Sequence, residues 1–187
     1  MKLAILSLFA ILISAQTVLA TPAAVVLLRH AEKPVDDQGT DLSPKGWDRA
    51  KALPSFFHDR GEVKVYGLPV ALFAVTPKNP GGSLRSIETL KYVADDLKLA
   101  LNTEYTKKKG SDLAARIMND HTLDGKLVVI CWDHDFIDDV AVALGAKSVP
   151  QYPAQVFDRA WLLQYDTAGA VKFTDLPQRL LPGDSDK

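Results

Sequence analysis

The sequence predicts a three-layer α/β/α sandwich with a mostly parallel central sheet and an antiparallel edge. Three apolar runs, at residues 24–28, 70–75 and 127–131, have the length and valine content of buried strands. After each run comes a segment with apolar residues at helical spacing. This repeated order of strand and helix is typical of a parallel sheet that helices cover on both faces.

The helices are predicted from capping residues and from apolar spacing. Ser43 and Pro44 have the character of an N-cap and a first helical residue, and Pro54 is expected to end this helix. Three further segments show the same spacing and are predicted to be helical: 87–97, 113–118 and 137–144.

The C-terminal part predicts the antiparallel edge. Residues 157–165 and 171–173 are apolar strand candidates, and the turn sequence Asp-Thr-Ala-Gly at 166–169 separates them. We therefore expect a closing hairpin. The polar tail at 181–187 is expected to be loose.

Composition and the N-terminus limit the class of protein. The chain has 187 residues, 22 Lys and Arg against 23 Asp and Glu, and one cysteine. This balance argues against nucleic-acid binding through bulk positive charge, and a single cysteine forms no intramolecular disulfide. Residues 1–20 have a basic start, an apolar centre and small residues before the end, as in a secretory signal peptide. We expect one secreted or periplasmic domain at 21–187, with no membrane attachment after cleavage.

Cationic and imidazole side chains follow the predicted strands. Arg29 and His30 come directly after the first strand, Arg85 after the loop beyond the second, and His134 after the third. Each alone has an ordinary explanation as a solvated or hydrogen-bonded residue at the rim of the sheet. Ligands of open α/β sheets bind beyond the carboxyl ends of the strands, so we expect these groups to converge. Two guanidinium and two imidazole groups predict a site for phosphate.

Four motifs occur in order along residues 25–145. They are a strand ending in Arg-His at 25–32, a Leu-Ser-Pro-Lys-Gly helix start with an Arg-Ala pair at 42–50, an Arg-Ser-Ile-Glu-Thr helix start at 85–89, and a strand running to a second His at 128–134 with Ala-Leu-Gly at 143–145. This ordered set resembles the histidine phosphatases, the phosphoglycerate mutase-like superfamily. The resemblance implies the same layered fold and phosphoryl-transfer chemistry.

The resemblance also implies a role for each of four residues. His30 is the implied nucleophile, Arg29 and Arg85 bind the phosphoryl oxygens, and His134 donates a further hydrogen bond to the same group. A neutral imidazole that attacks phosphorus forms a phosphohistidine, which divides one displacement into two. The guanidinium groups stabilise the charge, so neither a metal nor a cofactor is expected.

The proton donor to the leaving group stays open between three carboxyl groups. Asp135 directly follows His134, as in the acid phosphatase branch of the family, and we favour it. Glu104 lies where the mutase branch has its donor, and Glu32 lies close to the nucleophile. Asp135 also has a purely structural explanation as the N-cap of the following helix.

Two features depart from the family pattern, and some other residues need no functional explanation. Ala31 replaces the usual Gly after the nucleophile, and the loop at 76–84 is longer than the family's turn. Cys131 is expected to be a buried strand residue. No histidine or cysteine pair has zinc-site spacing, and residues 133–135 offer too few ligands, so no metal-ligating residues are assigned.

The expected function is that of an exported phosphatase that hydrolyses phosphomonoesters through a phosphohistidine on His30, without metal. A compact domain leaves little room for the lid of a mutase, which favours hydrolysis. The substrate is expected to be a small phosphorylated molecule or a phosphoprotein, and not a nucleic acid. The alternative is a catalytically inactive relative that holds phosphate or a phosphorylated partner through Arg29, Arg85 and His134.

Overall fold

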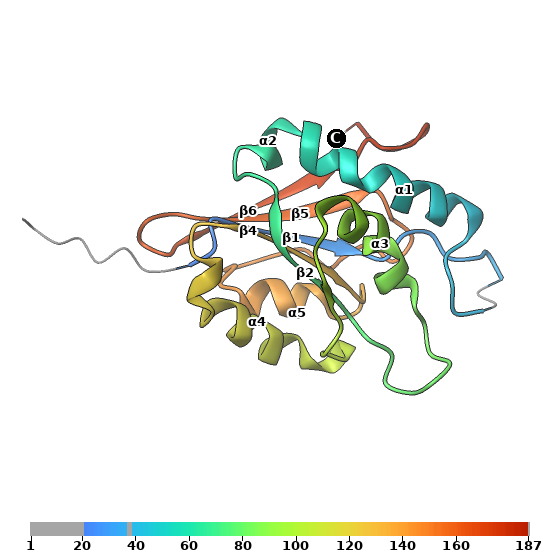
Figure 1. Cartoon of the computed structure of the whole chain (residues 1–187), viewed down its shortest axis with the longest axis horizontal. Coiled ribbons are helices and arrows are strands. Elements are labelled where there is room, and N and C mark those ends of the chain that lie inside the picture. Colours follow the sequence, from blue (N-terminus) through green and yellow to red (C-terminus); the bar gives the residue numbers. More distant parts are fainter. Residues whose placement is uncertain (1–20, 37–38, 187) are drawn as a thin grey trace, which may run out of the picture.

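The computed structural model describes residues 21–36 and 39–186. These residues form a six-stranded sheet with helices on both faces, which confirms the predicted three-layer α/β/α sandwich (Figure 1). The signal peptide predicted for residues 1–20 lies outside the described residues.

The sheet is mixed, with its parallel part on one side. The strand order is β3-β2-β4-β1-β5-β6, and β1, β2, β3 and β4 run parallel whereas β5 and β6 are antiparallel to their neighbours. The strands are β1 (Ala24–Arg29), β2 (Pro69–Ala74), β3 (Leu101–Asn102), β4 (Leu127–Trp132), β5 (Arg159–Tyr165) and β6 (Val171–Pro177). The closing hairpin is confirmed, and the short edge strand β3 was not predicted.

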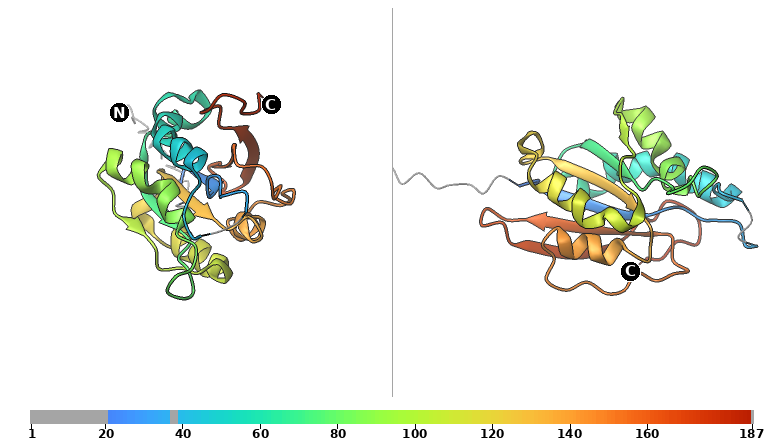
Figure 2. Two further views of the ribbon diagram at one scale, coloured as in Figure 1. Left: turned by 90° about the vertical axis from the view of Figure 1, so that its right-hand side faces the viewer. Right: turned by 90° about the horizontal axis from the view of Figure 1, so that it is seen from below.

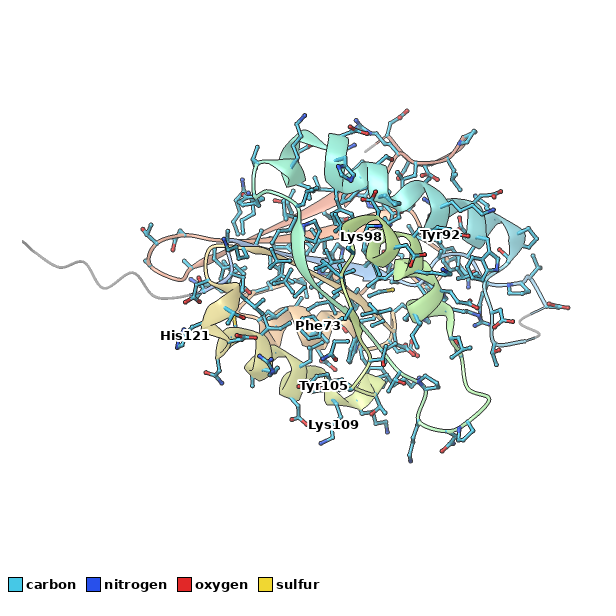
Figure 3. All side chains as sticks on the ribbon, viewed as in Figure 1. Phe73, Tyr92, Lys98, Tyr105, Lys109 and His121 are labelled. Carbon is cyan, nitrogen blue, oxygen red and sulfur yellow. The ribbon has the colours of Figure 1, made fainter. Side chains whose placement is uncertain are left out.

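The helices form two layers (Figures 1 and 2). Because side chains alternate along a strand, Val26 and Leu28 of β1 face the layer of α1, α2 and α3, whereas Val25 and Leu27 face α4 and α5. Apolar side chains fill both spaces (Figure 3). The helices are α1 (Pro44–Asp59), α2 (Gly61–Lys64), α3 (Arg85–Leu97), α4 (Gly110–Met118) and α5 (Ile137–Ala143).

The expected end of the first helix at Pro54 is wrong. Ser43 is its N-cap and accepts a hydrogen bond from the Gly46 N–H, as predicted, but α1 continues through Pro54 to Asp59. A proline inside a helix costs about 3 kcal/mol. Phe56 and Phe57, both fully buried beyond the proline, contribute about 1.5–3 kcal/mol each, so their burial outweighs this cost.

The expectation of a loose C-terminal tail is also wrong. The carboxylate of Asp184 accepts hydrogen bonds from the backbone N–H groups of Leu180 and Leu181 and pairs with Arg49 at 2.7 Å. Ser185 donates from its backbone and its hydroxyl to Asp158. Polar contacts therefore fix a segment whose composition alone suggested disorder.

Two further observations concern the core and the membrane. Cys131 of β4 is completely buried, as predicted for a structural thiol. Among the described residues, no helix combines the length and the apolar character needed to cross a bilayer.

Substitution of Gly46 tests how closely α1 packs on the segment that follows β1. A Cβ atom at this position would lie 2.3 Å from the carbonyl oxygen of Glu32, which is backbone and cannot rotate away. We expect Gly46→Ala to destabilise the protein by about 1–3 kcal/mol, measured by urea unfolding.

Gly61→Ala is the matched control, because the same added methyl at the start of α2 meets no atom within 4 Å. It should change the free energy of unfolding by no more than about 0.5 kcal/mol. Equal effects of the two substitutions would contradict the close packing of α1 on Glu32.

Candidate active site

The carboxyl ends of the parallel strands open onto one cavity of about 410 Å³. His30 follows β1, His134 and Asp135 follow β4, and Arg85 begins α3, which follows β2; all four line the cavity. Arg29, the last residue of β1, lies beside them and not on the lining. The structure thus brings the predicted site residues together at the edge of the sheet.

His30 is held as a neutral imidazole with a defined tautomer. Its Nδ1 lies 2.7 Å from the carbonyl oxygen of Ala31, and because a carbonyl only accepts, Nδ1 carries the proton. Nε2 therefore keeps a lone pair. Burial is the largest cause that lowers the pKa of His30; the hydrogen bond to the Ala31 carbonyl opposes it, the charges of Arg29, Arg85 and His134 act in the same direction as burial, and the net pKa is about 4.

The Ala31 backbone is fixed in turn by α3. The N–H of Ala31 donates to the hydroxyl of Thr89 at 2.8 Å, and that hydroxyl donates to the carbonyl of Arg85 at 2.6 Å. The methyl of Ala31, which replaces the family's usual Gly, is 1% exposed and packs against Leu42 and Ala50. The departure from Gly is therefore accommodated by burial.

Arg29 is 1% exposed and only partly satisfied. Its Nη1 donates to the carbonyl of Ala154 at 2.6 Å and of Val156 at 3.2 Å, and its guanidinium carbon lies 3.9 Å from the centre of the Phe157 ring. Nε and Nη2 are buried and have no hydrogen-bond partner within the described part of the chain. Burial lowers the pKa of this guanidinium, and two of its nitrogen atoms can donate to a ligand.

Arg85 reaches the cavity from the first residue of α3. Its Nε donates to the carbonyl of Asp41 at 3.1 Å and its Nη2 to the carbonyl of Gly39 at 2.9 Å, and the residue is 8% exposed. The long loop before it lines the same cavity through Thr76 and Ser83. The insertion relative to the family pattern thus forms part of the cavity wall.

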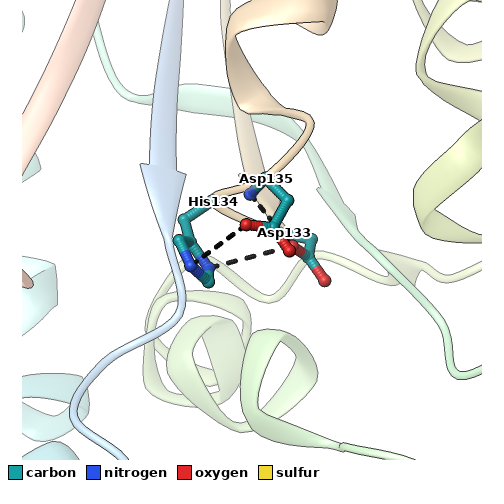
Figure 4. Close-up of side chains that lie close together, drawn as sticks. All are labelled: Asp133, His134 and Asp135. Carbon is teal, nitrogen blue, oxygen red and sulfur yellow. Dashed lines mark hydrogen bonds and ion pairs between the residues drawn. The ribbon is translucent and has the colours of Figure 1, made fainter. Parts of the chain in front are cut away.

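His134 lies next to two carboxylates (Figure 4). Its Nε2 is 3.3 Å from Asp135 and its Nδ1 is 3.8 Å from Asp133. Burial and the charge of Arg29 lower the pKa of His134, and the two carboxylates oppose this shift in part. The N-cap of α5 is Phe136, so the structural explanation of Asp135 as a cap is wrong.

Of the three candidate proton donors, only Asp135 lines the cavity. Glu104 lines a separate hollow together with Arg116. Glu32 lines a different cavity, together with Arg49, which binds its carboxylate at 2.8 Å. Although burial raises the pKa of Glu32, the hydrogen bonds from Arg49 lower it, and the net shift is downward, which disfavours a role as an acid.

Asp133 also lines the cavity, but its carboxylate is already paired with other groups of the protein. Its carboxylate accepts from the Asp135 N–H at 3.1 Å and pairs with the Lys107 ammonium at 3.1 Å. Burial raises the pKa of Asp133, whereas these two donors lower it and determine the net shift. Asp133 is therefore a poorer proton donor than its exposed neighbour Asp135.

The sequence analysis missed three residues at the site. Lys33 and Lys107 line the cavity, and Phe157 packs on both Arg29 and His30, with its ring centre 5.9 Å from that of His30. Lys107 belongs to a run of three lysines that gave no reason to single it out. Phe157 was placed in a strand, but β5 begins at Arg159 and leaves Phe157 in the preceding loop.

One group of described residues has the composition of a metal site. Asp133, His134 and Asp135 place one ligand atom each within 4.8 Å of one another. These three consecutive residues supply one ligand fewer than a closed tetrahedral site needs, and Lys107 already neutralises Asp133. The cluster is better suited to proton transfer and hydrogen bonding than to holding a metal.

Chemically, the site joins a neutral imidazole to a cluster of cationic donors. An anion in the cavity would meet Arg85 and His134 on the lining. The charge of Arg29 acts on both His30 and His134, and its Nε and Nη2 have no hydrogen-bond partner among the described residues. His30, whose Nε2 keeps a lone pair, lines the same cavity. The arrangement can therefore bind a tetrahedral oxyanion and attack it.

No protein-family model matches the sequence, and no curated protein shows significant similarity to it. Several solved structures, however, are similar to the chain in fold. The chain resembles a protein histidine phosphatase SixA complexed with tungstate, with a TM-score of 0.58 and 15% identity over 83% of this chain and 97% of that chain.

Two other structures have similar scores. YhfR of Bacillus stearothermophilus has a TM-score of 0.56 at 14% identity, covering 80% of this chain and 94% of its own. A phosphoserine phosphatase mutant from Entamoeba histolytica, in complex with phosphoserine, has a TM-score of 0.54 at 13% identity, covering 84% and 98%. Together with the strand order, these likenesses show that the chain has the phosphoglycerate mutase-like fold.

Proposed function

We propose that this chain is a phosphatase that hydrolyses phosphomonoesters through a phosphohistidine on His30. One observation carries the proposal: a partly buried imidazole, kept neutral mainly by desolvation and fixed in its tautomer by the Ala31 carbonyl, follows directly after Arg29, whose Nε and Nη2 have no acceptor among the described residues. A site for a neutral ligand would not need uncompensated cationic donors at such depth. The related folds include phosphatases solved with tungstate and with phosphoserine, which agrees with this proposal.

In the first step, Nε2 of His30 attacks the phosphorus and the bond to the leaving oxygen breaks. Nδ1 stays protonated, so the Ala31 carbonyl stabilises the positive charge that develops on the ring. Arg29, Arg85 and His134 donate to the three phosphoryl oxygens, where charge is greatest. Asp135 gives a proton to the leaving oxygen, and the product alcohol departs.

In the second step, water attacks the phosphohistidine and the bond from phosphorus to Nε2 breaks. Asp135, now ionised, accepts a proton from this water, which restores its starting state. The products are inorganic phosphate and neutral His30. The charge stabilisation comes from guanidinium and imidazole groups, so we propose that the reaction needs no metal.

The place of action and the substrate are part of the same proposal. We propose that residues 1–20 direct export and are removed, which places the phosphatase in a periplasm or outside the cell. The cavity is open to solvent and lined by Lys33 and Lys107, which suits a small phosphorylated molecule or a phosphorylated side chain of a protein.

Replacing the nucleophile tests the proposal directly. The His30→Ala variant should lose turnover of p-nitrophenyl phosphate, because the proposed intermediate forms on this imidazole. The parent protein should retain full activity in excess EDTA. Brief reaction with a phosphoryl donor should leave an adduct that is acid-labile and base-stable on the peptide containing His30, detected by mass spectrometry.

His58→Ala serves as the control, because His58 is exposed on α1 and pairs with Asp96 far from the cavity. It should match the parent in rate and in labelling. Parental turnover by His30→Ala, or an adduct on another residue, would show that the nucleophile is wrongly assigned.

The proton donor is tested with two leaving groups. Asp135→Asn should reduce kcat on an alkyl phosphate by about 10²–10⁴-fold, and much less on p-nitrophenyl phosphate, whose leaving group needs little protonation. Glu104→Gln, which alters the separate hollow, should leave both rates near those of the parent. If Asp135→Asn slowed both substrates equally, or if Glu104→Gln had the larger leaving-group effect, Asp135 would not be the donor.

The low pKa of His30 predicts how its protonation depends on pH. The ring should stay neutral as the pH falls below 6.5, the ordinary value, and should gain its proton only near pH 4. Between these values the unfolded state binds more protons than the folded state, so His30 makes the stability decrease as the pH falls from about 6.5 to 4. NMR titration of ¹⁵N-labelled imidazoles measures this pKa, with His30→Asn identifying the signal, and titration near pH 6.5 would contradict the buried neutral state.

A further inference from the structure

A buried ionic cluster lies behind the nucleophile, and Arg49 of α1 is at its centre. Arg49 is 2% exposed, and each of its five N–H donors has an acceptor. It binds Glu32 at 3.0 and 2.8 Å, Asp184 at 2.8 and 2.7 Å, and Gln178 at 3.2 Å. We call Glu32, Arg49, Gln178 and Asp184 the Arg49 cluster.

The cluster is fully ionised and tightly coupled. Burial opposes charge on Arg49, but its hydrogen bonds to Asp184 and Glu32 raise its pKa above the ordinary value. Burial likewise raises the pKa of Asp184, whereas Arg49 and the backbone N–H groups of Leu180 and Leu181 lower it to about 2. A buried ion group is weak evidence for stability, because apolar residues of similar volume often stabilise as well. Apolar residues, however, would not reproduce the directed hydrogen bonds of the Arg49 cluster.

One arm of the cluster fixes the segment that carries His30. The Glu32 side chain is bound by two Arg49 nitrogen atoms, and its carbonyl accepts from the Ser43 N–H at 2.9 Å. Gly46 packs directly on the same carbonyl. Because Glu32 directly follows Ala31, this attachment holds the Ala31 carbonyl, which sets the tautomer and direction of the His30 ring.

The other arm fixes the opposite side of the nucleophile. The Gln178 amide accepts from Arg49 and donates to the carbonyls of Phe157 at 3.3 Å and of Arg159 at 2.9 Å. The Phe157 ring in turn packs on the Arg29 guanidinium and beside His30. The Arg49 cluster therefore holds both flanks of the reacting imidazole.

The C-terminal segment closes the cluster. Asp184 supplies two of the acceptors of Arg49, and its neighbour Ser185 is bound to Asp158 at 2.6 and 3.0 Å. We propose that Asp184 is a positioning residue: by completing the coordination of Arg49, the C-terminal segment keeps Ala31 and Phe157 in place and so holds His30 in its reactive orientation. This inference rests on the proposed role of His30.

Three variants test the proposal on the full chain. Asp184→Asn removes the charge and places an amide N–H₂ against the Arg49 donors. Asp184→Glu keeps the carboxylate. Asp186→Asn removes the same charge two residues further on, outside the Arg49 cluster, and is the matched control.

We expect Asp184→Asn to lower kcat by about 10–100-fold with little change in KM, because misplacing the nucleophile affects the reaction more than it affects binding. The pKa of His30, read by NMR without substrate, should rise toward its ordinary value as water reaches the loosened ring. Asp184→Glu should recover part of the lost kcat and part of the shift in the His30 pKa, and Asp186→Asn should match the parent in both quantities. A folded Asp184→Asn with parental kcat and parental His30 titration would overturn the proposal.

Folding is checked by circular dichroism. If Asp184→Asn does not fold, Arg49→Lys takes its place, because lysine keeps the positive charge and cannot bind both carboxylates in pairs; the same shifts support the proposal and their absence overturns it. Because NMR measures the His30 pKa without turnover, it also tests the positioning role of Asp184 separately from the proposed phosphatase activity. A parent protein without phosphatase activity would refute the proposed function, whereas the response of the His30 titration to Asp184→Asn still decides whether the cluster positions the ring.

Discussion

The burial of Arg29 at the end of β1 is the constraint on which the rest of the site depends. A guanidinium removed from water needs acceptors, and the loop at 153–156 supplies them to only one of its nitrogen atoms. The other two nitrogen atoms have no acceptor in the part of the chain that the structure describes. Burial also lowers the pKa of the neighbouring His30, so desolvation leaves the guanidinium with unused donors and keeps the imidazole neutral. In the proposed reaction the first effect favours binding of an anion and the second preserves a lone pair for attack.

Sheet topology explains why distant residues meet at this point. β1 and β4 are parallel and in register up to Arg29 and Trp132, so the residues after both strands emerge side by side. β5 is antiparallel to β1 and begins where β1 ends, with Ala160 opposite Leu28. The antiparallel partner therefore places the loop before it, with Phe157 and the carbonyls that bind Arg29, at the edge where the parallel strands have their carboxyl ends. A fully parallel sheet would place that loop at the other edge.

Much of the fold and the main site residues could be predicted, because each rests on a local pattern. The runs that became β1 and β4 are continuously apolar; His30 directly follows β1, and His134 lies two residues after the end of β4. The rest depends on contacts between distant residues. Pro54 is a helix breaker by local rules, and only the burial of Phe56 and Phe57 overrides it. The two-residue strand β3 has no apolar run to mark it, and nothing in a polar tail indicates that Asp184 pairs with an arginine some 135 residues earlier.

Cys131 gives the fold an internal reporter. It is the chain's single thiol, it lies in the central strand β4, and burial raises its pKa to about 12. A thiol reagent needs both access and a thiolate, and the native sheet offers neither. The rate at which such a reagent modifies the protein therefore measures how often the sheet opens between β1 and β2, and no engineered probe is needed. An oxidising environment leaves the sulfur unmodified as long as that sheet stays closed.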